Sequence, residues 1–358
     1  MSKLILAINP GSTSTKISVY EDRKEVFTKT LRHTSEELAP FKNVIDQFAF
    51  RKEAIKAALE ENNIELGSLN VIVGRGGLVK PISSGVYLVN QALIEDVRKG
   101  VSGEHASNLG AILANDLATE IGGGVKAFIT DPVVVDELEP VARITGHPLF
   151  KKASIFHALN QKVIAKKYAR EIGRDYNSLN LIVAHLGGGV SVGIHSKGRV
   201  IDVNDALSGE GPFSPERSGG LPAVQLAEAC FSGKYTYGQI KKMISGAGGV
   251  VSYLGTNSFQ EVAKRVEAGD KEAILISDAF EYQLCKEIGA MATVVSGKVD
   301  AILITGGIAY NSVMMESVKK RVGYIAPVHV YPGEDEMGAL AGNALDAIEG
   351  REEIKIYE

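Results

Sequence analysis

Three glycine-rich turns follow apolar, strand-like segments, and together they could bind an anion. They are residues 9–14 (Asn-Pro-Gly-Ser-Thr-Ser), 185–189 (His-Leu-Gly-Gly-Gly) and 305–307 (Thr-Gly-Gly). Glycine lets backbone N–H groups converge on an anion because no Cβ stands in the way. Successive N–H groups in such a turn form a concavity that holds phosphate. A single hairpin glycine is usually structural, so the prediction depends on the three turns together.

Neighbouring side chains add charge and hydrogen-bond donors to these turns. Ser12 and Ser14 supply hydroxyls, Lys16 supplies a positive charge, and His185 precedes the triple glycine. None of the three turns is a Walker A loop, whose Lys-Ser/Thr pair opens a helix, and the chain has no G-x-G-x-x-G. We expect the first two turns to face each other and hold the β- and γ-phosphates of a nucleotide, while the third seats the nucleoside.

The first two turns belong to an internal repeat. An offset of 177 residues, close to half of the 358-residue chain, pairs Ala7 with Ala184, Ile5 with Ile182, Gly11 with Gly188 and Ser14 with Ser191. A chain of this length also exceeds the ~250–300 residues at which single cores stop growing. The repeat therefore predicts a duplicated protein of two domains.

The hydrophobic pattern predicts an α/β fold with mixed sheets flanked by helices. Strand patterns occur in the opening 30 residues and at 70–74, 85–89, 125–131, 179–203, 300–307 and 328–336. Helical patterns occur at 41–62, 106–121, 158–172, 222–231, 271–295, 311–322 and 337–350. We expect an N-terminal domain of residues 1–132 with 337–358, carrying the acyl and phosphate side, and a nucleotide-binding domain of residues 133–336.

Composition excludes several classes of protein. The net charge of −4 leaves no basic surface for nucleic acid or a membrane. No stretch approaches the ~18 apolar residues of a membrane span. The two cysteines, Cys230 and Cys285, lie far apart in sequence, which argues against a disulfide framework. The sequence predicts a cytoplasmic protein.

Six segments resemble the acetate kinase family of acyl-phosphate-forming kinases, within the actin, sugar kinase and heat-shock chaperone superfamily. They are INPGSTSTKISVY (8–20), ITDPVVVDEL (129–138), SIFHALNQ (154–161), AHLGGGVSVGIHSKGRVIDVNDAL (184–207), ERSGGLP (216–222) and ITGGIAYNS (304–312). The resemblance implies two duplicated actin-like (ribonuclease H-like) domains with a cleft between them. It also implies reversible, in-line phosphoryl transfer between ATP and a short fatty-acid carboxylate with Mg²⁺, in a homodimer or larger homo-oligomer.

This reaction needs no general base, because a carboxylate with a pKa near ~4–5 is already ionised at neutral pH. Positioning and neutralisation of phosphoryl charge must supply the catalysis. The resemblance assigns these tasks to Arg75, Arg217 and His157, and the orientation of the metal to Asp131.

The resemblance also assigns metal and nucleoside contacts. Asn9 and one acidic residue, Glu334 or Glu336, are further candidates near Mg²⁺, with Glu336 preferred. The adenosine of ATP or ADP is expected at Gly306, Gly307, Ile308 and Asn311, and Asn257 is expected at the ribose.

One difference from the sequences of acetate kinases bears on which carboxylic acid is the substrate. Those enzymes usually carry valines after the first arginine, where this chain has Gly76 and Gly77. We expect the lost side chains to open space beside the substrate carboxylate, with Phe156 as an apolar wall. Butyrate would then be converted to butyryl phosphate, since each buried methylene contributes ~0.8 kcal/mol. Acetate, propionate and branched acids such as isobutyrate remain alternative substrates. A different class, actin-like or chaperone-like ATP-binding proteins, would have no need of Arg75 and Arg217.

Overall fold

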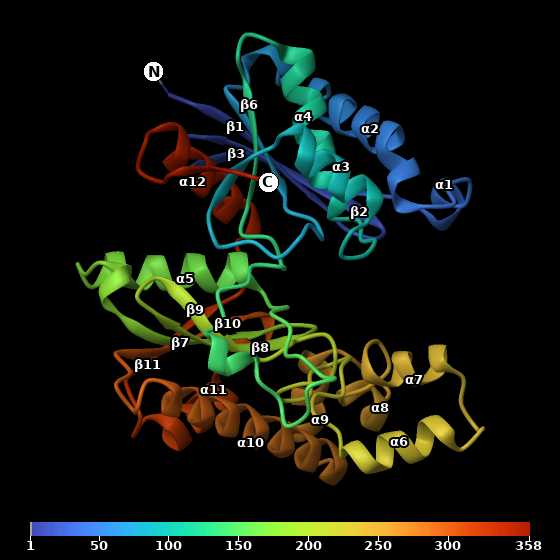
Figure 1. The fold of residues 1–358 in the computed structure, drawn as a ribbon, viewed down its shortest axis with the longest axis vertical. Coiled ribbons are helices and arrows are strands. Elements are labelled where there is room, and N and C mark those ends of the chain that lie inside the picture. The colour runs from blue at the N-terminus through green and yellow to red at the C-terminus, as the bar shows by residue number, and fades with distance from the viewer. Residues whose placement is uncertain (1) are drawn as a thin grey trace. The chain divides into compact units, whose positions relative to one another are not determined.

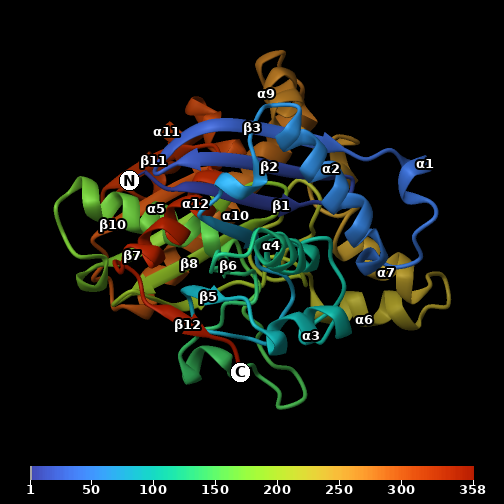
Figure 2. The same ribbon diagram turned by 90° about the horizontal axis from the view of Figure 1, so that it is seen from above.

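The computed structural model describes residues 2–358 and divides into two compact units. The first unit contains the residues up to Val135 together with Asp335–Glu358, and the second is Asp136–Glu334. Figures 1 and 2 show the ribbon of the chain in two views, coloured from the N-terminus to the C-terminus. The first unit thus combines the two ends of the chain and includes Glu336, which the sequence analysis placed in the second domain.

The sheet of the first unit has seven strands in the order β12-β5-β6-β4-β1-β2-β3. β1, β2 and β3 form an antiparallel meander, and β4 and β6 continue the sheet parallel to β1. The bounds are β1 Leu4–Pro10, β2 Ser14–Glu21, β3 Lys24–Arg32, β4 Val71–Arg75, β5 Val86–Leu88, β6 Lys126–Thr130 and β12 Ile354–Ile356.

Helices cover both faces of this sheet, with α4 and α12 on opposite sides (Figure 1). A Cβ at Gly74 would overlap the backbone of Gly110, so the two glycines let α4 lie directly against β4. This close packing fixes the end of β4, where Arg75 stands. The bounds are α1 Ser35–Leu38, α2 Phe48–Glu60, α3 Gln91–Lys99, α4 Asn108–Ile121 and α12 Glu336–Ile348.

The sheet of the second unit has five strands in the order β11-β10-β7-β8-β9. Its strands are β7 Asn180–Leu186, β8 Val190–Ser196, β9 Arg199–Val203, β10 Ala301–Gly306 and β11 Val328–Pro332. Order and strand directions match β6-β4-β1-β2-β3 of the first unit. The predicted α/β fold with duplicated mixed sheets is therefore confirmed. The two glycine turns differ in length by one residue. The β1–β2 pairing ends at Pro10 and Thr15, and the β7–β8 pairing ends at Leu186 and Val190.

Alternating residues of β7 pack on the two faces of its sheet. Ile182 and Ala184 join the core beneath α10 and α11, whereas Leu181 and Val183 join the core beneath α5. Figure 1 shows α5 and α10 on opposite faces of this sheet. The helices are α5 Ala158–Glu171, α6 Ala223–Phe231, α7 Tyr237–Ile244, α8 Val250–Leu254, α9 Phe259–Glu267, α10 Lys271–Val294 and α11 Ser312–Val322. Within residues 2–358, none of the helices has the length and apolar character to cross a membrane.

Candidate active site

The first glycine turn is held from behind by a buried arginine of α2. Arg51 is 0% exposed, and its Nη1 donates to the carbonyls of Gly11 at 2.9 Å and Ser14 at 2.8 Å. Its Nη2 donates to the carbonyl of Ser12 at 3.1 Å. Because these carbonyls point inward to the guanidinium, the turn is locked in one conformation.

Among residues 2–358, the acceptors around Arg51 are all neutral. Besides the carbonyls they are the Thr15 hydroxyl and the side-chain amide oxygen of Gln47. Burial lowers the pKa of Arg51 to about 10, which is still far above neutral pH, so the guanidinium stays charged. A buried cation without an anionic partner is costly, and a phosphate on the outer side of the turn would compensate it. The sequence analysis missed Arg51, since an arginine in a helix ordinarily indicates a solvated face.

We expect Arg51→Met to raise the KM for ATP by about tenfold, because a loosened turn misplaces the N–H groups that face the nucleotide. Steady-state kinetics with varied ATP would measure this. Lys52→Met is the matched control on the same helix, because Lys52 pairs with Asp116 and Glu120 instead. Equal KM values for the two variants would contradict a role for Arg51 in the turn.

Three predicted residues meet at the ends of β1, β4 and the start of α12. Asn9 Nδ2 donates to Glu336 Oε2 at 2.6 Å, and Arg75 Nη1 lies 2.9 Å from Glu336 Oε1. Arg75 Nη1 also lies 3.4 Å from Asn9 Oδ1. Side chains of Arg75 and Glu336 are 26% and 19% exposed, so the cluster reaches solvent. The other polar residues predicted in this unit lie on the hairpin: Ser12 and Lys16 are exposed, and Ser14 is half-buried.

Asp131 follows β6 and adopts an unusual backbone conformation. Its φ is +39°, in the left-handed region that a non-glycine residue seldom occupies, and it is 3% exposed. Its Oδ1 accepts from Ser84 Oγ at 2.6 Å and from the backbone N–H of Gly85 at 2.9 Å. Strain of this kind often accompanies functional sites, and these bonds hold the carboxylate in a fixed orientation.

The space expected at Gly76 and Gly77 is filled by protein. A Cβ at Gly76 would lie 2.6 Å from Pro132 Cβ, and one at Gly77 would lie 2.6 Å from Asn108 Cα. Asn108 Oδ1 also accepts from the backbone N–H of Leu78 at 2.8 Å, which ties this loop to α4. The argument from open space is therefore wrong: the glycines permit close packing. Phe156, the predicted wall, is 2% exposed and belongs to the second unit.

Gly77→Val is consequently expected to damage the site instead of changing its preference. The branched side chain would push the loop away from α4 and displace Arg75, so kcat/KM should fall about tenfold or more for every short acid. A panel of acids assayed with this variant decides the matter. A selective gain for acetate over butyrate would instead restore the pocket argument.

The second turn is built around Arg217. A Cβ at Gly189 would overlap the Arg217 guanidinium, so glycine at this position lets the arginine lie against the turn. Arg217 Nη1 donates to the carbonyl of Ala206 at 2.7 Å, and burial lowers the pKa of Arg217. Ser214 Oγ donates to the carbonyl of Gly188 at 2.7 Å and accepts from the Arg217 N–H at 3.1 Å. The turn and Arg217 are therefore linked through the side chain of Ser214 and by direct contact at Gly189.

The two predicted histidines lie face to face. The rings of His157 and His185 stack with centroids 3.9 Å apart at an interplanar angle of 20°. His185 Nε2 lies 3.1 Å from Glu334 Oε1, whereas its buried Nδ1 has no hydrogen-bond partner among residues 2–358. His157 Nδ1 lies 2.8 Å from Ser191 Oγ. This nitrogen lies beside the glycine turn and could hydrogen-bond to a bound group.

A cavity of about 310 Å³ brings the second and third turns together. It is lined by Gly187, Gly188, Pro215, Asn257, Ser258, Phe259, Gln260, Gly307, Ile308 and Glu334. Five of the residues predicted to bind nucleotide thus share one cavity, which Glu334 also lines. Two others have visible structural tasks. Gly306, with φ +96°, lets β10 end against Leu186 of β7, and Asn311 caps α11 by accepting from the Met314 N–H at 3.1 Å.

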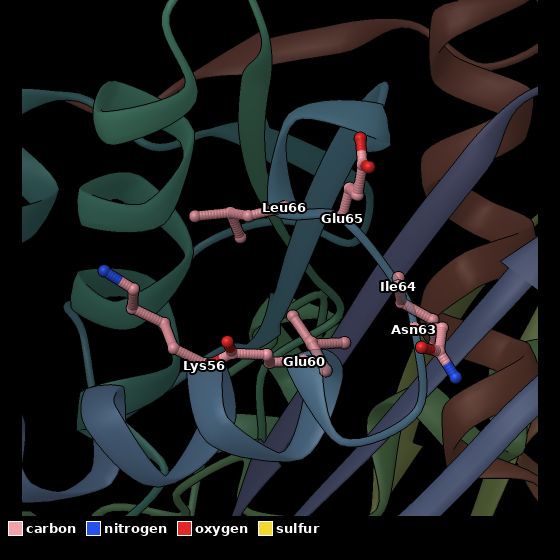
Figure 3. Close-up of a pocket in the computed structure, with 7 residues that line it drawn as sticks. Lys56, Glu60, Asn63, Ile64, Glu65 and Leu66 are labelled. Atoms are coloured by element: carbon pink, nitrogen blue, oxygen red, sulfur yellow. The ribbon is translucent and has the colours of Figure 1, made fainter.

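A second hollow, of about 490 Å³, lies at the end of α2 (Figure 3). It is lined by Lys56, Leu59, Glu60, Asn63, Ile64, Glu65 and Leu66, none of them a predicted site residue. Lys56 is already paired with Glu120 at 2.5 Å. This hollow therefore offers no chemistry for the predicted reaction.

The carboxylates of Glu336 and Asp131 could bind a cation whose other ligands come from the substrate and from water. Within residues 2–358, no group of three or more His, Cys, Asp and Glu could hold a metal by itself. Mg²⁺ commonly takes one or two protein oxygens and fills its remaining positions with water and phosphate. Asn9 and Glu336, already in contact, and the oriented Asp131 supply oxygen donors of the right kind.

Known proteins resemble this chain over its whole length. Residues 151–325 match the model of the acetokinase family. Butyrate kinases 1 and 2 of Clostridium acetobutylicum are 56% and 54% identical over 354 residues, which is 99% of this chain and of each relative. The acetate kinase of Porphyromonas gingivalis superposes with a TM-score of 0.78 at 17% identity, covering 97% of this chain and 100% of that one. A propionate kinase of Francisella tularensis gives a TM-score of 0.74 at 18% identity, covering 96% and 99%.

The solved structures, at 17% and 18% identity, show only that the fold is shared. The relatives at 56% and 54% identity show the family. The full-length identity above 50% and the family match confirm the resemblance inferred from the six segments. We conclude that this chain belongs to the acetokinase family.

Proposed function

We propose that this protein is a butyrate kinase, which reversibly transfers the γ-phosphoryl group of ATP to butyrate and forms butyryl phosphate and ADP. One structural observation carries the proposal. A single cavity joins Gly187 and Gly188 to Gly307 and Ile308, and Arg217 lies against the same glycine turn. This arrangement supports polyphosphate and nucleoside subsites beside a cation. The relatives named butyrate kinase at 56% and 54% identity support the choice of acid.

The transfer requires no proton movement. A butyrate oxygen attacks the γ-phosphorus, the new P–O bond forms in line, and the bond to the β–γ bridging oxygen breaks to release ADP. Charge on the transferring group must be balanced throughout, which suits planar, bidentate guanidinium donors. We assign this task to Arg75 and Arg217, with His157 as a further donor.

We assign the tasks of substrate orientation to residues of each unit separately. In the first, Asn9 and Glu336 would hold Mg²⁺ together with the oriented Asp131, while Arg75 binds the carboxylate. When bound, Mg²⁺ neutralises phosphate charge. In the second, the N–H groups of 187–189 bind phosphate and the cavity with Asn257 and Ile308 holds the nucleoside. The action of both units on one ATP is a prediction.

The proposal can be tested by trapping the product with hydroxylamine. Purified protein with ATP and Mg²⁺ should form an acyl hydroxamate from straight and branched acids of two to five carbons, with the highest kcat/KM for butyrate. A higher value for acetate, propionate or isobutyrate would replace butyrate as the substrate. Absence of product with every acid would favour an actin-like or chaperone-like ATP-binding protein instead.

The resemblance further supports a homodimer or a larger homo-oligomer. Sedimentation equilibrium should then give a mass at least twice the 38.2 kDa of one chain. A mass of one chain across the accessible concentrations would contradict this assignment.

A further inference from the structure

His157 is connected to the interior of the second unit through the hydroxyl of Ser191. Ser191 is 0% exposed on β8, and its Oγ lies 2.8 Å from His157 Nδ1. Two N–H groups also point at this oxygen, the side-chain amide of Gln161 at 2.9 Å and the backbone N–H of His157 at 3.5 Å. A hydroxyl oxygen has two acceptor positions and one proton. Because the Gln161 amide nitrogen and the backbone N–H can only donate, His157 Nδ1 is the acceptor that these contacts offer to the Ser191 proton.

The orientation of the Gln161 amide is fixed by an independent contact. Its Nε2 also donates to the backbone carbonyl of Ser191 at 3.2 Å, and a carbonyl can only accept. The amide oxygen must therefore face the other way, toward His195 Nε2 at 3.0 Å. Gln161 is 0% exposed, and a Cβ at Gly193 would come within 2.7 Å of its Oε1, so glycine at 193 makes room for the amide.

His195 completes the chain of hydrogen bonds. Since an amide oxygen only accepts, His195 must carry a proton on Nε2. Burial lowers the pKa of His195 well below its ordinary value, so the ring is neutral and its Nδ1 is an acceptor. Tyr176 OH lies 2.8 Å from this Nδ1 and donates to it. The contacts from Tyr176 to Ser191 are thus satisfied by one consistent set of donors and acceptors.

We propose that Gln161, acting through Ser191 and anchored by His195, is a positioning residue that holds His157 as the neutral tautomer protonated on Nε2. With Nδ1 accepting from Ser191, Nε2 is the nitrogen that carries the proton. His157 then donates a hydrogen bond and cannot accept one at that atom. This inference rests on the proposed function, in which His157 donates to the transferring phosphoryl group.

The tautomer is a property that a purely structural network would not need. A phosphoryl oxygen accepts hydrogen bonds and repels a lone pair, so the Nε2–H form stabilises charge on the migrating group. The opposite tautomer would present a lone pair from the same ring in the same place. The reaction itself needs no proton acceptor, which fits a histidine fixed as a donor.

Nitrogen chemical shifts test the proposal directly. In protein labelled with ¹⁵N-histidine, the long-range ¹H–¹⁵N pattern of His157 at alkaline pH should be that of a neutral ring protonated on Nε2. Gln161→Glu should reverse this pattern. A carboxylate cannot donate to Ser191, so the hydroxyl turns to donate to it and accepts from His157 Nδ1–H instead. The same variant should lower kcat at least about tenfold with little change in KM.

Gln161→Met separates this effect from packing. Methionine removes the donor to Ser191 without supplying an acceptor, so both neutral tautomers of His157 become accessible, and kcat should fall less than in Gln161→Glu. A structural role predicts the opposite order, with the polar replacement tolerated better than methionine. Gln225→Glu, the same change at an exposed position of α6, is the control and should leave kcat and the His157 shifts unchanged.

The outcomes distinguish this proposal from the proposed function. A His157 protonated on Nδ1 in the unaltered protein, or an unchanged pattern in Gln161→Glu, overturns the tautomer assignment even if the protein is an active kinase. An Nε2–H His157 that reverses in Gln161→Glu supports the assignment, and this result stands even if no acid yields an acyl phosphate. In that case it is the proposed function that fails.

Discussion

Arg217→Met should lower kcat for acyl phosphate formation by about 10³-fold or more, the scale at which an arginine acts on a transferring phosphoryl group. Arg217 is half-buried and lies against the second glycine turn, with its guanidinium held by the carbonyl of Ala206. Methionine keeps much of the side-chain volume but removes the charge and the planar donors. Single-turnover measurements with saturating ATP and butyrate would show whether the loss lies in the transfer step.

Two further variants make the result specific. Arg217→Lys retains the charge without the bidentate fork, so its kcat should fall between those of the unaltered protein and Arg217→Met. Arg199→Met removes an exposed arginine of the same unit that pairs with Glu139, and it should change kcat by no more than about twofold. Activity of Arg217→Met close to that of Arg199→Met would show that Arg217 does not contact the reacting group.

Gly189→Ala should lower kcat/KM by about 10²-fold through the same arginine. The added methyl group would occupy the position of the Arg217 guanidinium, which must then move away from the turn. A displacement of about 1 Å at a positioned group can cost a factor of this size. Steady-state kinetics together with the melting temperature would separate a displaced arginine from an unfolded protein.

The neighbouring glycine provides the matched control. A Cβ at Gly188 meets no atom within 4 Å, and Gly188 has no positive φ, so alanine fits there without strain. Gly188→Ala should therefore keep kcat/KM within about tenfold, since only the close approach of phosphate to the turn is affected. Equal losses in the two variants would mean that the turn is sensitive to any side chain, independently of Arg217.

The main elements of the fold could be predicted because their signals are local. β1 and β7 are continuous apolar runs ending in glycine turns, and α10 has a helical period over 24 residues. The sequence analysis missed shorter elements. The nine-residue α3 is marked mainly by its caps, Asn90 and Gly100, and the three-residue β12 exists because β5 offers it a partner. Such elements depend on tertiary contacts more than on periodicity.

In the candidate site, too, local sequence signals could be predicted, whereas features that depend on tertiary contacts could not. Motifs indicated Asn9, Arg75 and Glu336, but only the folded chain shows that they lie within hydrogen-bond distance. Sequence patterns could not reveal Arg51, because burial of a helical arginine follows from packing against the hairpin. Missing side chains at Gly76 and Gly77 suggested empty space, whereas the fold fills that space with Pro132 and Asn108. Residue types were thus predictable, and the volume around them was not.

The most direct test is a crystal structure with ADP, Mg²⁺, butyrate and aluminium fluoride in place of the transferring phosphoryl group. We predict that the ADP phosphates lie within about 3 Å of backbone N–H groups at residues 11–14 and 187–189. The fluoride ligands should contact Arg75, Arg217 and His157 Nε2, in line with a butyrate oxygen. An ADP bound with its phosphates remote from both turns would contradict the account at its base.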